Sequence, residues 1–252
     1  VDQLHKSRAW IGINDYDFSW ILEAGDSFTA PEAVMVYSAE GLGEMSRNYH
    51  KLYRTRLVRG KYRDEVRPIL ANNWEGTYFD FTEEKIVSLA KEAAGLGIEL
   101  LVLDDGWFGK RNDDNCSLGD WYVNTDKLPS GITGLAEKVN ACGVKFGLWF
   151  EPEMVSPDSD LYRAHPDWCI HTPGRDRNET RNQLTLDVSR KEVQDYIVES
   201  VCKILDTANI SYVKWDMNRH MSELGSAGLP AERQKEMPHR YMLGLYDVLE
   251  RV

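Results

Sequence analysis

The amino-acid sequence predicts an α/β protein that contains part of a (β/α)8 TIM barrel. From residue 68 onward, short apolar runs of the kind that form buried parallel strands alternate with amphipathic helical patterns. Such strand–helix units in series imply a parallel sheet with right-handed crossovers. Polar and acidic residues follow every apolar run, and that edge of a (β/α)8 barrel is where its chemistry takes place. An open doubly wound sheet remains an alternative, although no dinucleotide-binding or phosphate-binding glycine motif follows any predicted strand.

The first 67 residues differ in character from the rest of the chain. Three aromatic-rich segments read as short strands separated by turn residues: 10–13, 18–22 and 33–37. Because so few strands cannot bury a core of their own, residues 1–40 are interpreted as the C-terminal part of a β-domain. Residues 41–67 have a helical and basic pattern, which suits a connecting segment before the barrel region, 68–252.

The barrel region contains five predicted strands, which are 69–74, 99–103, 145–150, 183–187 and 211–215. The first helix starts after Thr82, whose hydroxyl can accept a hydrogen bond from an unpaired backbone N–H. Later helices are predicted at 132–142, at 190–208 and from Ala231 onward. Ser189 and Glu192 have the spacing of a capping box before the second of these. A complete barrel has eight units, so about three are expected beyond Val252.

Composition excludes several classes of protein. The 252 residues include 30 Lys and Arg against 41 Asp and Glu, a net charge of −11, which disfavours binding to nucleic acid or to an anionic membrane. No apolar run is long enough to span a bilayer. The four cysteines form no CxxC pair and the histidines no HExxH motif, so a structural zinc site of that kind is not expected. Sparse thiols predict a reducing, cytoplasmic location.

The residues that follow the predicted strands suit a pyranose sugar. Indole rings can stack on the C–H faces of the sugar, while carboxylates and amides can bind its hydroxyls. A single acidic residue after a strand more often caps a helix, but repetition over four strands favours a site. The candidates are Trp74, Asp104, Asp105, Trp149, Lys214, Asp216 and Asn218.

The segment 214–219, Lys-Trp-Asp-Met-Asn-Arg, is the most specific feature. Side chains alternate along a strand, so Lys214, Asp216 and Asn218 are expected on one face. A lysine beside Asp216 would favour its ionised form, and an oriented carboxylate can attack an anomeric carbon. The alternative is a structural ion pair.

In their order along the chain, several motifs resemble those of the α-galactosidases of glycoside hydrolase family 36. They are Asn73-Trp74-Glu75, Leu103-Asp104-Asp105-Gly106-Trp107, Trp149-Phe150-Glu151-Pro152-Glu153-Met154 and Lys214-Trp215-Asp216-Met217-Asn218-Arg219, together with the stretch 31–38. The resemblance implies that residues 1–40 are the last strands of an N-terminal β-sandwich, and that 68–252 are the first five units of the catalytic barrel.

The resemblance also implies a retaining mechanism on terminal α-galactosides such as melibiose and raffinose, with no metal or organic cofactor. Asp216 matches the nucleophile of the family. Its sugar-binding residues are matched by Trp74, Asp104, Asp105, Trp149, Arg181, Lys214 and Asn218. Asp104 and Asp105 would bind galactose hydroxyls, and Trp74 and Trp149 would form walls of the pocket. A homotetramer is the oligomeric state that the family suggests.

A retaining glycosidase needs a second carboxyl group about 5–5.5 Å from the nucleophile, to act as acid and base. Only residues 217–252 follow Asp216, and none of their carboxylates follows a predicted strand. The acid/base is therefore expected outside this chain, and the isolated chain is expected to be inactive and poorly folded. Glu151 and Glu153, separated by a proline, are interpreted as structural.

Three other functions remain open. A galactosyltransferase of the raffinose-synthase type would share the covalent intermediate and differ in its acceptor. A sugar-binding protein without turnover would need no acid/base. A lyase could hold Mg²⁺ with Asp104, Asp105 and Glu151, and use Lys214 as its base.

Overall fold

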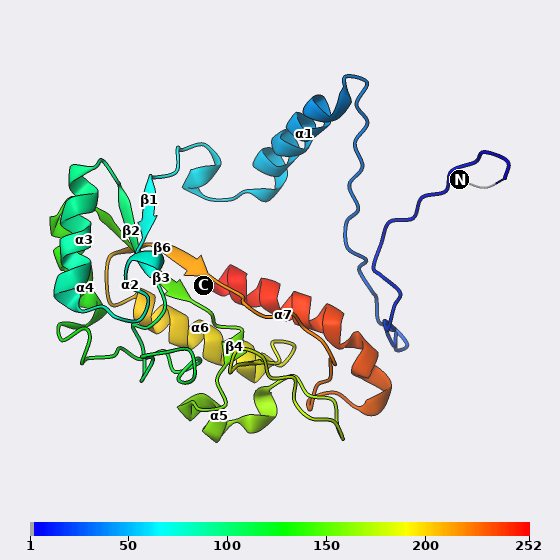
Figure 1. The fold of residues 1–252 in the computed structure, drawn as a ribbon. Coiled ribbons are helices and arrows are strands. Elements are labelled where there is room, and N and C mark those ends of the chain that lie inside the picture. The colour runs from blue at the N-terminus through cyan, green and yellow to red at the C-terminus, as the bar shows by residue number, and fades with distance from the viewer. Residues whose placement is uncertain (1–2) are drawn as a thin grey trace. The chain divides into compact units, whose positions relative to one another are not determined.

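The computed structural model describes residues 3–252, and residue contacts divide the chain between Arg67 and Pro68 (Figure 1). The division coincides with the predicted start of the barrel region. The interpretation of residues 1–40 as part of a β-sandwich stays a prediction.

In the first unit, α1 (Gly41–Leu52) is followed by a π-helical turn (Tyr53–Leu57) and a 3-10 turn (Lys61–Arg63). These elements occupy the segment predicted to be helical. The three strands predicted before residue 40 are wrong, because the structure forms no strand within residues 3–40. A strand needs a partner for its backbone N–H and C=O groups. Here backbone hydrogen bonds include local ones, such as Phe18 N–H to Asp15 O, and Trp10 is exposed.

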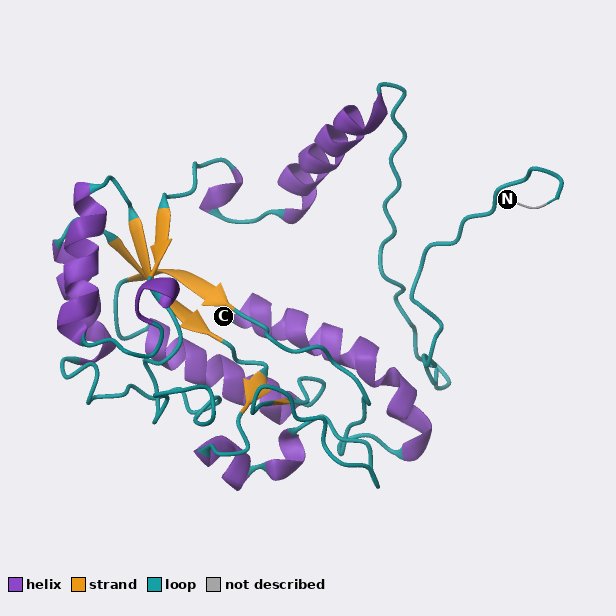
Figure 2. Ribbon diagram, viewed as in Figure 1, coloured by secondary structure: helices purple, strands orange, loops and turns teal. Residues whose placement is uncertain are grey.

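The second unit is built on a four-stranded parallel sheet in the order β1-β2-β3-β6. Its strands are β1 (Leu70–Asn72), β2 (Leu100–Leu103), β3 (Lys145–Phe150) and β6 (Ile210–Trp215). The main helices are α3 (Glu83–Gly95), α4 (Gly131–Ala141), α6 (Lys191–Leu205) and α7 (Met237–Arg251). Shorter elements are α2 (Trp74–Thr77), α5 (Asp160–Ala164) and 3-10 turns at Pro166–Trp168 and Ala231–Glu236. In Figure 2 the arrows of the sheet converge, and the long helices lie outside them.

The predicted strand at 183–187 does not join this sheet, so the sheet has four strands rather than five. Within this range, β5 (Leu184–Thr185) pairs antiparallel with β4 (Met154–Val155) in a separate two-stranded sheet. Neighbouring backbone groups also find partners outside the main sheet, since Ile170 N–H donates to Thr185 O and Asp187 N–H to Trp168 O. Strand β6 therefore pairs directly with β3. The parallel α/β class is confirmed, and the sheet is not closed into a barrel.

The structure confirms one of the two predicted helix caps and contradicts the other. The Thr82 hydroxyl accepts from Lys85 N–H at 3.3 Å, which confirms the N-cap of α3. In α6, Val193, Ile197, Val201 and Ile204 are buried and form its apolar stripe, and Leu205 beside them is half-buried. The capping box at Ser189 is wrong: the Ser189 hydroxyl donates to the Asp187 carboxylate, and α6 begins at Lys191 without a side-chain cap.

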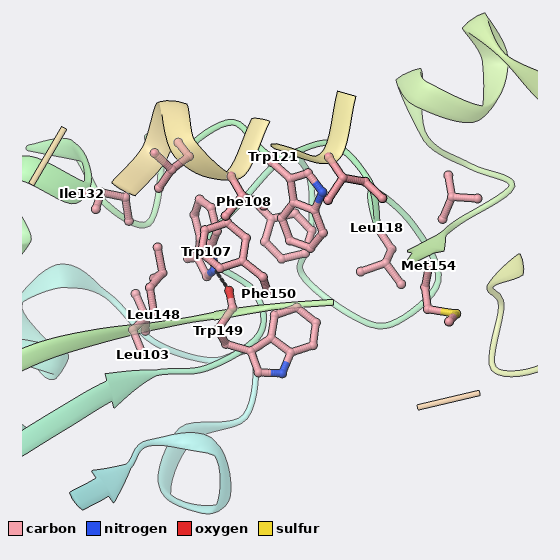
Figure 3. Close-up of a cluster of buried hydrophobic side chains, with 14 of the residues drawn as sticks. Leu103, Trp107, Phe108, Leu118, Trp121, Ile132, Leu148, Trp149, Phe150 and Met154 are labelled. Atoms are coloured by element: carbon pink, nitrogen blue, oxygen red, sulfur yellow. Dashed lines mark hydrogen bonds between the residues drawn. The ribbon is translucent and has the colours of Figure 1, made fainter. Parts of the chain in front are cut away.

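Beyond the end of β3, aromatic rings form the centre of the hydrophobic core (Figure 3). Trp107 packs edge-on against Phe108 and Phe150, with ring centroids 5.2 and 5.3 Å apart. Its indole N–H donates to the Trp149 carbonyl at 2.9 Å, the dashed bond in Figure 3. This bond joins the segment after β2 to the end of β3, which fixes the relative position of residues that approach the sheet edge.

The described residues contain no helix long and apolar enough to cross a membrane. The four cysteines are free thiols, as the sequence predicts. Burial raises the pKa of the Cys169 thiol to about 12, so this thiol stays protonated at neutral pH. The cytoplasmic location stays a prediction.

The contact between α6 and α7 depends on the absence of a side chain at Gly244. A Cβ there would overlap the Val188 carbonyl oxygen and lie 2.6 Å from Gln194 Nε2. We expect Gly244→Ala to lower the free energy of unfolding by about 1–3 kcal/mol in equilibrium urea unfolding, because the helix must shift. The control is Gly95→Ala in α3, where a Cβ meets no heavy atom within 4 Å. An equal or smaller loss in Gly244→Ala than in this control would contradict the packing argument.

Candidate active site

The end of β1 supplies an amide scaffold for the candidate site. Asn73 Oδ1 accepts from Asp104 N–H at 2.7 Å, and Asn72 Nδ2 donates to Asp104 Oδ2 at 2.5 Å. The backbone N–H of Trp74 donates to Asn72 Oδ1 at 2.8 Å. The Trp74 ring is half-buried and meets the ring of Phe79 edge-on at 5.0 Å. The two asparagines thus hold Asp104 and Trp74 at one edge of the sheet.

The two carboxylates after β2 have different cationic partners. Lys214 Nζ, from β6, lies 2.8 Å from Asp104 Oδ2. Asp105 receives a bidentate contact from Arg111, with Nε 3.0 Å from Oδ1 and Nη2 2.8 Å from Oδ2. Gly106 has φ +105°, a conformation that other residues rarely adopt, and this lets the chain turn directly after Asp105. Both carboxylates are buried and charge-compensated.

Arg111 was not predicted from the sequence. It is buried, and its Nη1 also donates to Cys116 O at 2.9 Å, which anchors the loop after β2. Burial raises the pKa of Asp105, while the Arg111 hydrogen bonds and charge oppose that rise. The sequence offers no periodic signal for this contact, because Arg111 lies in an irregular segment.

Asp216 follows β6 directly, and hydrogen bonds orient its carboxylate. Its backbone N–H donates to Phe150 O at 2.8 Å, which extends the pairing of β3 with β6. Its Oδ2 accepts from Trp149 Nε1 at 3.1 Å and from Asn218 Nδ2 at 2.8 Å. Its Oδ1 accepts from Met217 N–H at 3.1 Å. All three donors are uncharged.

The expectation that Lys214 is the ionic partner of Asp216 is wrong. Among the ion pairs of the described residues, Lys214 pairs with Asp104, and Asp216 takes part in none. The reason is the position of Trp149, which pairs with Lys214 in register and whose indole N–H contacts Asp216. Lys214 instead bridges β6 to the end of β2.

Glu151 and Glu153 follow β3 and are both buried, 1% and 3% exposed. Glu153 accepts from Trp215 Nε1 at 3.0 Å and from the Tyr241 hydroxyl at 2.5 Å, so it ties α7 to β6. Glu151 accepts from Asn218 N–H at 2.6 Å. Burial, with the nearby charges of Asp216 and Asp105, raises the pKa of Glu151 to about 7. Glu151 therefore faces the candidate site, a placement that the sequence did not predict.

Arg181 is not joined to this cluster. It is exposed, has φ +56°, and forms no hydrogen bond or ion pair with the cluster among the described residues. Its role in sugar binding stays a prediction. Trp74, Asp104, Asp105, Trp149, Lys214, Asp216 and Asn218 do lie at the ends of β1, β2, β3 and β6, as predicted.

The geometry disfavours the magnesium-dependent alternative. No group of three or more His, Cys, Asp or Glu side chains within residues 3–252 is arranged to hold a metal ion. Asp104 already pairs with Lys214, and Asp105 with Arg111.

Comparison with known proteins shows which family this chain resembles. A family model described as Melibiase matches residues 27–252. The chain is 64% identical to α-galactosidase AgaA of Geobacillus stearothermophilus over 252 residues, and 51% identical to α-galactosidase Mel36A of Lactobacillus acidophilus over 251. Each match covers the whole chain but only 35% and 34% of the relative. The chain thus spans about a third of the length of these relatives.

Solved structures give the same result. The crystal structure of AgaA from Geobacillus stearothermophilus, a glycoside hydrolase family 36 α-galactosidase, superposes with a TM-score of 0.93 at 65% identity. The superposition covers 95% of this chain and 33% of that one. An α-galactosidase from Lactobacillus brevis gives the same TM-score at 48% identity, with 95% and 32% coverage. With the family model covering most of its length, the chain belongs to the Melibiase family, the α-galactosidases of glycoside hydrolase family 36.

Proposed function

We propose that this chain carries the nucleophile and part of the sugar pocket of a retaining α-galactosidase. An Asp216 oxygen attacks C1 of a terminal α-galactoside and forms a C1–O bond, while the bond from C1 to the leaving oxygen breaks. The leaving oxygen takes a proton from an acid, and water later releases galactose from the ester. The carrying observation is the Asp216 carboxylate, which uncharged donors orient beside the Lys214–Asp104 pair.

The relatives support this choice of substrate. Structures of AgaA variants from Geobacillus stearothermophilus are described in complex with raffinose and with stachyose. In this chain, Asp104 and Asp105 would accept from galactose hydroxyls, with Lys214 and Asn218 donating nearby. Trp74, half-buried at the same edge, would contact the C–H face of the sugar.

The acid/base is proposed to come from a carboxyl group outside these 252 residues. Among the later carboxylates, Glu236 is buried between Arg233 and Arg240, and Asp247 pairs with Lys191 and Arg251. Glu223 pairs with Arg175 in an exposed loop. None of these groups lies at the end of a strand.

The role of Asp216 can be tested in a full-length chimera, in which this chain replaces the matching third of AgaA; we call it the AgaA chimera. We expect Asp216→Gly to lower kcat on 4-nitrophenyl α-galactoside by about 10⁴-fold or more, because the covalent intermediate cannot form. Azide should restore turnover and give β-galactosyl azide, identified by NMR. Asp206→Gly, at an exposed aspartate after α6, is the matched control and should retain activity.

Near-full activity in Asp216→Gly, without azide, would remove Asp216 from this role. Products of the unmodified chimera, measured with raffinose and sucrose present, separate hydrolysis from transfer to a sugar acceptor. Galactose as the main product supports hydrolysis, whereas galactosylated acceptor supports the transferase.

The isolated 252-residue chain should not hydrolyse raffinose, because the leaving oxygen of raffinose needs a proton and the acid/base is proposed to lie outside these residues. The measurement is galactose release from raffinose by the chain and by the AgaA chimera at equal concentration. Hydrolysis by the isolated chain that Asp216→Gly abolishes would show that an acid/base lies within these residues.

A further inference from the structure

Glu151 lies at the point where the strand that pairs with β6 ends. Phe150, the last residue of β3, accepts from Asp216 N–H through its carbonyl at 2.8 Å. The next residue, Glu151, accepts from Asn218 N–H through its side chain at 2.6 Å. Two consecutive residues of β3 and its extension therefore hold the backbone on both sides of the Asp216 carboxylate.

Asn218 needs such an anchor, because β6 ends at Trp215 and residues 216–220 have no regular structure. Its side chain donates to Asp216 Oδ2 at 2.8 Å. The direction of that amide depends on the backbone of Asn218. A displacement of the loop would move the amide off the carboxylate, and Asp216 would lose one of its two Oδ2 donors.

We propose that Glu151 is a positioning residue for the nucleophile: its buried carboxyl holds Asn218 N–H, and Asn218 in turn holds Asp216 in the orientation for attack. The inference rests on the proposed function of Asp216. It assigns Glu151 no contact with substrate.

The surroundings of Glu151 are consistent with a hydrogen-bond acceptor that need not carry charge. The groups that act on it are Asn218, which donates, two carboxylates, Asp216 and Asp105, which oppose its ionisation, and the charge of Arg219, which favours it without a direct ion pair. No ion pair within residues 3–252 includes Glu151. The carbonyl oxygen of a neutral carboxyl can still accept from Asn218 N–H.

A second role must be separated from this one, because a buried glutamate whose pKa is raised to about 7 also suits a general acid. A general acid protonates the leaving oxygen. Its loss therefore lowers kcat/KM for substrates with poor leaving groups and spares kcat/KM for aryl galactosides, whose leaving group needs little protonation in the first step. Loss of nucleophile orientation harms both kinds of substrate.

The test compares Glu151→Met with Glu151→Gln in the AgaA chimera, on raffinose and on 4-nitrophenyl α-galactoside. Met has a similar length and no strong acceptor, whereas Gln keeps a carbonyl oxygen. We expect Glu151→Met to lower kcat by about 10- to 100-fold on both substrates, with KM changed far less, because the reacting carboxylate is misplaced. Glu151→Gln should recover most of that loss at pH 5–6.

The matched control is Glu153→Met, the same substitution as Glu151→Met at a glutamate two residues away that is also buried. Glu153 contacts Trp215 and Tyr241 rather than Asn218. We expect this variant to lose stability to heat while its kcat on both substrates stays within about threefold, since no contact with the nucleophile changes. A similar fall in kcat in both glutamate variants would mean a general effect of disturbing the end of β3.

Three results would overturn the proposal. Glu151→Met could retain the kcat of the unmodified chimera, Glu151→Gln could be as slow as Glu151→Met, or both could lose turnover on raffinose alone. The last result would assign Glu151 as the acid. Failure of the proposed function would give a different result. In that case the Asp216→Gly variant would keep its activity, although the Glu151 variants are folded.

The pH dependence of stability gives a readout that does not depend on activity. Burial raises the pKa of Glu151 to about 7 in the folded protein, from an ordinary value of 4.5. As pH rises from 4.5 to 7, the unfolded carboxyl ionises and the folded one does not, so this group lowers the free energy of unfolding with rising pH. Urea unfolding of Glu151→Gln should lack that decline relative to the unmodified chimera. Equal pH dependence in the two proteins would show that Glu151 is already ionised in the fold.

Discussion

The pairing of β3 with β6 is the constraint on which the candidate site depends. Trp149 pairs with Lys214 and Phe150 with Trp215, and the bond from Asp216 N–H to Phe150 O continues the same register. Because side chains alternate along a strand, a slip of one residue would turn Asp216 and Lys214 to the other face. Trp149 takes part in this arrangement through two hydrogen bonds. Its carbonyl accepts from Trp107, and its indole N–H donates to Asp216.

The site concentrates four carboxyl groups at one edge of the sheet, and each is stabilised differently. Asp104 pairs with Lys214, and Asp105 with Arg111. Glu151 forms no ion pair among the described residues, and burial raises its pKa to about 7. Repulsion between neighbouring carboxylates is thereby reduced. The two cations come from different elements, so the site depends on the packing of β2, β6 and the loop that contains Arg111.

The sequence predicts the residues that follow strands better than it predicts their partners. Apolar runs and the edge rule placed Asp104, Asp105 and Asp216 correctly, because alternation and parallel pairing are local and repetitive. The partner of Lys214 is not local: it is Asp104, 110 positions away in the chain. The prediction that 183–187 is a strand of the main sheet is wrong for a related reason. Its pattern suits a buried strand, and only tertiary contacts decide that it pairs with Met154–Val155 rather than with the main sheet.

The contrast between Asp216 and its acidic neighbours bears on which carboxylate reacts. A carboxylate in a bidentate contact with arginine, such as Asp105, has its charge compensated, although it keeps lone pairs that can accept from hydroxyls. Asp216 is half-buried and accepts only from uncharged N–H groups, which fix its direction without adding a positive charge. A sugar that develops positive charge at C1 is stabilised most by such a carboxylate, since no nearby cation in direct contact cancels its field. The electrostatics of the edge therefore favour Asp216 as the attacking group and its paired neighbours as ligands for hydroxyls.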